Sequence, residues 1–145
     1  MLKVKKLHPD AKLPTVAHPG EDLAYDLYAL EESNLYGNCQ TIRTGIAAQA
    51  YDPIEGFEIP LGLLIRDRSS MAKKGIVITG GVVDAGYTGE ISVVMKNTRD
   101  YRYRIEKGDK IAQMIPIPVL TGEVIEVEEL RESSRGELGF GSSGR

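Results

Sequence analysis

The sequence has few of the residues that build disulfides and zinc sites. Its single cysteine, Cys39, excludes an internal disulfide, and two histidines, His8 and His18, are too few to complete a convincing zinc site with it. No apolar run approaches the roughly 20 residues that span a bilayer, and the N-terminus lacks the apolar stretch of a signal peptide. We therefore expect a cytoplasmic protein with no membrane partner.

A strong charge of either sign is also absent. Eighteen basic and 21 acidic residues give a net charge of −3, which argues against stable binding to nucleic acid. Glycine, in contrast, is abundant, with 16 residues in a chain of 145, or about 11% against a usual share of about 7%. The excess indicates many tight turns, or backbone held close to a ligand, in what has the length of one domain.

Helical periodicity is nearly absent, and the apolar residues come in short β-branched runs. Gly, Pro, Asp and Asn separate these runs, which span residues 42–46, 57–65, 76–78, 91–95, 111–117 and 124–130. This spacing predicts an all-β sandwich, barrel or jelly roll. Prolines inside two of the runs, at Pro60, Pro116 and Pro118, indicate edge positions or bulges.

One short helix is predicted over residues 69–74, with a serine as its N-cap and Gly75 ending it. Arg68, Ser69 and Ser70 open this helix, where backbone N–H groups, two hydroxyls and a guanidinium could hold a phosphate. The alternative is that a serine only caps the helix and that Arg68 is a solvated surface charge.

The segment 79–89 has four glycines between two β-runs and predicts a hairpin whose backbone can approach a planar ligand. Asp84 follows two valines, so partial desolvation would make its carboxylate a stronger base. Tyr87 could pack against a sugar. The alternative is a turn aspartate that bonds its own backbone, with Tyr87 as a half-buried strand residue.

Other candidate residues are scattered along the chain. Asp26 is a lone acid in an apolar stretch, either bonded to backbone or part of a metal–phosphate site. Gln113 follows two apolar residues and faces either a pocket or solvent. Residues 132–145 have the composition of a flexible terminus, but Arg135 and Phe140 are unusual in a linker and could close over an anionic, planar ligand.

Five segments, in order along the chain, together resemble the homotrimeric deoxyuridine triphosphate nucleotidohydrolases, the trimeric dUTPases. The resemblance covers about residues 1–145, and its segments are 24–27, 67–72, 81–90, 107–113 and 135–144. The third and fifth are the most specific. The sequence departs from the family pattern at Leu23, Ala24, Ser70, Ile78 and Leu138.

The resemblance implies a distorted jelly-roll or β-barrel-like subunit, all-β with one short helix and a flexible C-terminal arm, in a homotrimer. Residues 1–132 would form the core, and residues 133–145 would close over the active site. The implied activity is Mg²⁺-assisted hydrolysis of dUTP to dUMP and pyrophosphate, which limits uracil incorporation into DNA and supplies dUMP for dTMP synthesis. Each site would combine the first, second and fourth segments of one chain with the third of another and the tail of a third.

The resemblance also implies roles for individual residues. Asp84 would activate the water that attacks the α-phosphate, and Asp26 would position Mg²⁺ indirectly, through water. The other expected residues hold the phosphates, the uracil edge and the sugar, or cover them from the arm: Arg68, Ser69, Ser70, Gly81, Val82, Val83, Tyr87, Gln113, Arg135, Phe140, Gly141, Ser142 and Ser143.

Two other functions stay open. A dCTP deaminase, or its bifunctional relative, has the same fold but would need a proton-shuttling glutamate where this chain has Val94. A regulatory module that responds to dUTP by controlling a protein partner might carry an inserted surface segment, and none is obvious between the five segments.

Overall fold

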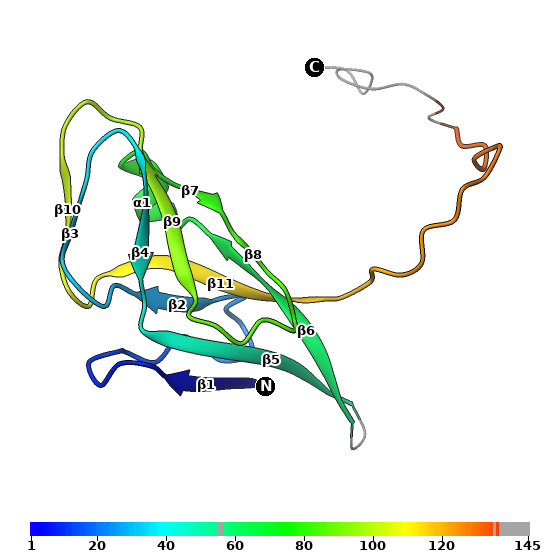
Figure 1. Cartoon of the computed structure of the whole chain (residues 1–145), viewed down its shortest axis with the longest axis horizontal. Helices are drawn as coiled ribbons and strands as arrows, with labels where there is room; N and C mark the ends of the chain where they lie inside the picture. Colours follow the sequence, from blue (N-terminus) through cyan, green and yellow to red (C-terminus); the bar gives the residue numbers. More distant parts are fainter. Residues whose placement is uncertain (55–56, 135, 137–145) are drawn as a thin grey trace.

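The computed structural model describes residues 1–54, 57–134 and 136. They form a nearly all-β subunit with one short helix, as the β-branched runs predict (Figure 1). The elements are β1 (Leu2–Lys6), β2 (Tyr25–Tyr28), β3 (Ser33–Leu35), β4 (Cys39–Arg43), β5 (Ile46–Ile54), β6 (Phe57–Arg66), α1 (Ser69–Lys73), β7 (Ile76–Gly80), β8 (Val82–Val83), β9 (Ser92–Asn97), β10 (Tyr103–Ile105) and β11 (Lys110–Pro118). Within these residues, no helix has the length and apolar character needed to cross a membrane.

The strands form three sheets in a distorted jelly roll. The largest has the order β1-β5-β6-β11-β2, with β8 added to β6, and the other two are β4-β9-β7 and β10-β3. All of the pairings are antiparallel. In Figure 1, β4 and β9 run steeply across the nearly level β5, β11 and β2, so that the sheets enclose one core.

Alternation along the strands supplies this core. In β9, Val93 and Met95 are fully buried, whereas Val94 between them is only half-buried. β11 contributes Ile111, Ala112 and Met114 from the opposite sheet. The two faces therefore bury a continuous set of aliphatic side chains, which holds the sheets in fixed positions and, through them, the loops at their ends.

Two prolines of β11 lie where the strand has a partner on one side only. Pro116 and Pro118 pair with β6, at Leu63 and Leu61, whereas the pairing of β11 with β2 ends at Met114. The prediction of edge positions is thus confirmed for these prolines. On the side of the strand that has no partner, the missing proline N–H removes no hydrogen bond from the sheet.

The predicted strand over residues 124–130 is wrong for the single chain. Residues 119–127 carry no strand, and the trace leaves the sheets at the end of β11 and runs clear of them (Figure 1). Its apolar side chains are open to solvent, with Leu120, Val124 and Leu130 at 90%, 95% and 87% exposure. Such a strand needs a neighbouring edge to pair with, and the described part of the same chain does not provide one.

A buried asparagine fastens the turn after β9. The Asn97 side-chain amide donates to the carbonyl oxygens of Leu35 and Tyr101, at 3.2 and 2.6 Å, and its oxygen accepts from the Arg99 N–H at 2.9 Å. Asn97 is 1% exposed and Leu35 is fully buried, so the Asn97 amide and the Leu35 carbonyl have no water as a ready substitute for each other.

Replacing Asn97 with leucine should lower the free energy of unfolding by about 2–4 kcal/mol, because a leucine of similar size leaves buried polar groups without partners. Urea unfolding of the wild type and the variant measures the difference. Asn34→Ala, at an exposed position of β3, is the control and should change stability by less than about 0.5 kcal/mol. Equal stability of Asn97→Leu and Asn34→Ala would contradict this role for Asn97.

Candidate active site

Three strands and the start of the helix converge on one polar pocket. Gln113 of β11 is paired with Asp26 of β2 on one side and with Arg66 of β6 on the other, and β6 runs on into α1. This register delivers Asp26, Arg68, Ser69, Ser70 and Gln113 to one pocket of about 340 Å³. The residues expected to hold phosphates and to position the metal therefore lie together, and we call this the phosphate pocket.

The helix start differs from the prediction in one detail. The N-cap of α1 is Arg68, in an extended conformation and without a side-chain cap, and Ser69 is the first helical residue. A serine N-cap was the wrong expectation, because the extended backbone at Arg68 already starts the turn. Both serines are exposed and line the phosphate pocket, while Gly75 ends the helix with φ of 80°, as predicted.

Asp26 is held by two cations. Its Oδ1 accepts from Arg68 Nε at 2.8 Å and its Oδ2 from Lys110 Nζ at 2.7 Å. The hydrogen bond and the charge of Asp26 raise the pKa of Lys110. Of the two cations, only Arg68 was expected at this site, although Lys110 lies in one of the segments that carry the family resemblance.

Asp67 connects the phosphate pocket to the hairpin. Gln113 Nε2 donates to the Asp67 carbonyl oxygen at 2.8 Å, and the Asp67 carboxylate accepts from the Ile78 N–H at 2.8 Å. Gln113 thus uses one N–H of its side-chain amide for structure, and the second N–H and the oxygen are what it can offer to a ligand. Sequence reasoning gave Asp67 no role, although it lies next to Arg68 and begins the segment 67–72 that carries part of the family resemblance.

The hairpin from β7 to β9 forms a second pocket, of about 410 Å³, which we call the hairpin pocket. Val82, Val83, Asp84 and Tyr87 line it, together with Val94 of β9. Gly81 lies between two of the lining residues, Gly80 and Val82, and its carbonyl accepts from the Ile65 N–H at 2.7 Å. A Cβ at Gly81 would collide with the Ile65 carbonyl oxygen, so only glycine lets this backbone lie against β6.

A turn presents Asp84 and Tyr87 to the solvent. The Asp84 carbonyl accepts from the Tyr87 N–H at 3.0 Å, and the Tyr87 hydroxyl donates to the Glu90 carbonyl at 3.1 Å. Asp84 is exposed and Tyr87 is 46% exposed. The described residues of the same chain therefore do not desolvate Asp84 as expected. That desolvation would have to come from a ligand or from another subunit.

The phosphate pocket and the hairpin pocket share no lining residue. The chain brings Asp26, Arg68, Ser69, Ser70 and Gln113 together, and separately Val82, Val83, Asp84 and Tyr87, with Gly81 next to Val82. The expected arm residues lie outside the described residues: Arg135, Phe140, Gly141, Ser142 and Ser143.

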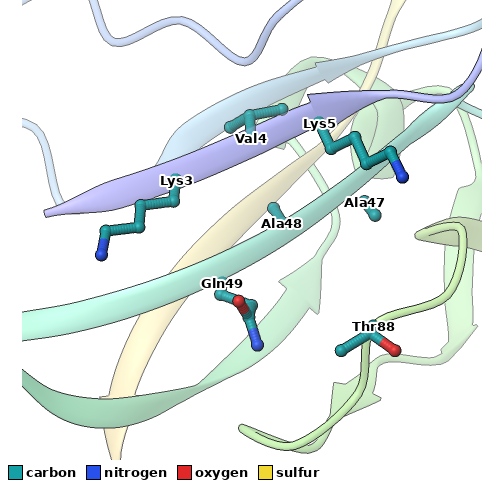
Figure 2. Close-up of a pocket in the computed structure, with 7 residues that line it drawn as sticks. All are labelled: Lys3, Val4, Lys5, Ala47, Ala48, Gln49 and Thr88. Carbon is teal, nitrogen blue, oxygen red and sulfur yellow. The ribbon is translucent and has the colours of Figure 1, made fainter.

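A different hollow of about 410 Å³ lies over the paired strands β1 and β5 and faces Thr88. Figure 2 shows Lys3 and Lys5 on β1, Ala47 and Gln49 on β5, and Thr88, which follows Tyr87, on the loop across from them. None of the residues expected to bind substrate lines it. It lies between the edge strand of the largest sheet and the hairpin segment.

Glu90 anchors the far end of the hairpin segment. Its carboxylate receives two hydrogen bonds from Arg43 Nε, at 3.2 and 3.1 Å, and one from the Gly45 N–H at 2.8 Å. Burial acts to raise the pKa of Glu90, but the Arg43 guanidinium and the Gly45 N–H act against it, and the net pKa is lowered.

This lowered pKa predicts how stability depends on pH. The folded pKa lies below the unfolded value of about 4.3, so the contribution of ionised Glu90 is complete above that value and is lost as the pH falls through the folded pKa. Glu90→Gln should cost about 1 kcal/mol at pH 7, and the difference should shrink below about pH 4. Thermal unfolding from pH 7 to 3 measures this, with Glu58→Gln, from an exposed pair with Lys3, as the control. A pH-independent difference would contradict the assignment.

The chemistry of the phosphate pocket fits an indirectly bound Mg²⁺. Asp26 retains acceptor capacity beyond the two cations, and Asp22 lines the same pocket with a second carboxylate. Backbone and side-chain groups of His18 lower the pKa of Asp22, which keeps it ionised. Since Mg²⁺ keeps several of its waters and binds largely through substrate phosphates, these two carboxylates suit water-mediated contacts.

Known proteins of one family match this chain over nearly its whole length. The model of the dUTPase family matches residues 10–144. The chain belongs to the dUTPase family. The deoxyuridine 5'-triphosphate nucleotidohydrolase of Clostridium tetani is 40% identical to it over 148 residues, covering 99% of this chain and 97% of the relative. That of Clostridioides difficile is 40% identical over 147 residues, with the same coverage.

Solved dUTPase structures share the fold. A mutant dUTPase of Staphylococcus bacteriophage 80alpha with dUpNHpp has a TM-score of 0.84 and 31% identity, covering 100% of this chain and 99% of that chain. A mutant dUTPase from phage phi11 of S. aureus, studied for the coordination of a structural Mg(II) ion, has a TM-score of 0.75 and 29% identity, covering 89% of this chain and 97% of that chain. The jelly-roll subunit predicted from the family resemblance is confirmed.

Proposed function

We propose that the chain hydrolyses dUTP to dUMP and pyrophosphate, with the α-phosphate as the point of attack. The observation that carries the proposal is the division of the expected residues of a dUTPase between two pockets with complementary chemistry. One pocket offers cations, hydroxyls and N–H groups for phosphates. The other offers an exposed carboxylate beside a strand backbone and an aromatic ring.

In the proposed reaction, Asp84 accepts a proton from a water molecule as the water oxygen attacks the α-phosphorus. The bond from the α-phosphorus to the oxygen that bridges it to the β-phosphate breaks, and pyrophosphate leaves with that oxygen. The proton on Asp84 then passes to solvent. Arg68, Ser69 and Ser70 hold the phosphates in line, and most of the rate gain comes from this positioning and charge neutralisation. When bound, Mg²⁺ supplies further neutralisation of the phosphates, and Asp26 would hold it through water.

Selection of uracil is proposed to depend on backbone atoms. The close packing of Gly81 on Ile65 fixes the main-chain groups of Val82 and Val83, which can pair with the edge of the base. The Tyr87 ring, fixed through its hydroxyl, would lie under the deoxyribose and leave no room for a 2′-hydroxyl. Val94 lines the same pocket and has no proton to transfer, which argues against deamination of cytosine there.

We infer that the working form is a homotrimer in which each site draws on several subunits. The separation of the two pockets supports this, because Asp84 of one chain could face the phosphate pocket of another. The exposed apolar side chains between Val119 and Leu130 also support it, since isolated monomers rarely leave so much apolar surface open.

Charge favours the edge of β1 as the place where this segment packs on another subunit. β1 is an edge strand, its exposed residues Lys3 and Lys5 line the hollow of Figure 2, and Lys6 is a third exposed lysine of the same strand. The segment 123–130 carries four glutamates at Glu123, Glu126, Glu128 and Glu129. An added strand with opposite charge would cover the exposed backbone of the edge.

A nucleotide specificity assay tests the proposed function. Purified protein with Mg²⁺ should release pyrophosphate from dUTP at least about 100-fold faster than from dCTP, dTTP or UTP, because groups placed to pair with one base are left unpaired by another. Comparable release from all four nucleotides, or release of ammonia from dCTP, would overturn it.

A further inference from the structure

Asp26 divides its two oxygens between two cations from different elements. Arg68, at the start of α1, occupies Oδ1, and Lys110, the first residue of β11, occupies Oδ2. The Asp26 side chain is 20% exposed and that of Arg68 29%, so this ion pair is only partly open to solvent. A terminal N–H of Arg68 also donates to the Lys110 carbonyl oxygen at 3.4 Å, and this second contact helps to fix the orientation of the guanidinium.

The position of Lys110 is set by strand pairing. Lys110 is opposite Tyr28 in the β2–β11 ladder, and the register shifts directly after it, before Ala112. Its ammonium lies 6.0 Å from the centroid of the Tyr28 ring, and the ammonium of Lys12 lies 5.4 Å from the same centroid. Lys12 donates to the Gly108 carbonyl instead of to Asp26. The two lysines thus share a ring, but only Lys110 contacts the carboxylate.

We propose that Lys110 is a positioning residue that keeps Arg68 available to the triphosphate; this rests on the function proposed above. By occupying Oδ2, Lys110 limits Asp26 to a single hydrogen bond with Arg68 Nε. Without Lys110, the planar guanidinium fork can close on both oxygens of Asp26, an arrangement that is stronger and withdraws N–H groups from the pocket. The Arg68–Asp26 pair would then also be neutral, whereas with Lys110 the three groups carry a net positive charge that attracts phosphates.

Steady-state kinetics with dUTP test this proposal. Lys110→Met, which keeps most of the side-chain length but not the charge, should raise KM about tenfold and lower kcat by a smaller factor, because Arg68 stays in the pocket with fewer N–H groups facing the phosphates. Lys110→Arg should recover most of the affinity, and Lys12→Met should leave both constants unchanged. An unchanged KM in Lys110→Met, or a failure of Lys110→Arg to recover affinity, would overturn the proposal.

An Asp26→Asn background separates action through Asp26 from direct contact with the substrate. In that background, Lys110→Met should change KM less than about twofold, because the neutral amide no longer holds either cation. A full tenfold effect there would show that Lys110 acts on the substrate directly, and the positioning role would be wrong.

Calorimetric titration with inorganic pyrophosphate and Mg²⁺ keeps this inference separate from the proposed function. If the wild type turns over no nucleotide, the proposed function fails, but the pyrophosphate affinities of wild type and Lys110→Met still decide the role of Lys110. We expect about tenfold weaker binding in the variant and wild-type binding in Lys12→Met. Equal affinity of Lys110→Met and the wild type would contradict the inference.

Discussion

Replacing Asp84 with asparagine should lower kcat for dUTP by about 10²–10⁴-fold while the affinity for the nucleotide changes little. The amide keeps the size of the side chain but cannot take a proton from water. The turn itself should survive, because it is made by the Asp84 carbonyl and the Tyr87 N–H, and not by the carboxylate. Single-turnover pyrophosphate release and calorimetric binding of a non-hydrolysable dUTP analogue measure the two effects separately.

The control for this change is Asp100→Asn, at an exposed position in the loop between β9 and β10. It should leave kcat and affinity at wild-type values. If Asp84→Asn keeps more than about a tenth of the wild-type kcat, Asp84 is not the base. If it loses affinity as strongly as kcat, its role is in binding.

Replacing Arg68 with alanine should lower kcat/KM for dUTP by at least about 100-fold, because charge-assisted bonds to phosphate are lost and Asp26 keeps one cation fewer. Both a higher KM and a lower kcat are expected, since the phosphates carry more charge in the transition state. Steady-state kinetics over a range of Mg²⁺ concentrations measure the effect.

Arg66→Ala provides a matched control two residues earlier in the chain. Arg66 is exposed at the end of β6 and lines neither the phosphate pocket nor the hairpin pocket. Its removal should change kcat/KM by less than about threefold. Equal losses in the two variants would mean that general positive charge, and not the placement of Arg68, accounts for the effect.

Much of the fold follows from local sequence features. The β-branched runs at 57–65, 76–78, 91–95 and 111–117 become strands β6, β7, β9 and β11, whereas the run at 42–46 spans the break between β4 and β5. The glycines at positions 75 and 81 lie where a left-handed residue or a close backbone approach requires them. The run at 124–130 has the same composition but forms no strand, because strand formation depends on a partner edge as much as on local preference. Composition alone could not show that this partner is missing from the described part of the chain.

The site was predictable as a set of residues but not as an arrangement. Sequence reasoning identified Asp26, Arg68 and Gln113 as candidates, and the structure places them in one pocket. It could not find the double pairing of Asp26, because the contact with Lys110 depends on a register shift between β2 and β11 that no local pattern specifies. Asp67 was missed for a related reason, as its partners come from strands that are distant in sequence.

Mixing two inactive variants tests the shared dUTPase site most directly. Asp84→Asn and Arg68→Ala chains, each inactive alone, would be co-expressed with different affinity tags and purified through both tags. If Asp84 of one subunit works with Arg68 of another, about one site in three of each mixed trimer holds both intact residues, and dUTP hydrolysis returns. If every site takes both residues from a single chain, the mixed protein stays as inactive as its two components, and the shared site is contradicted.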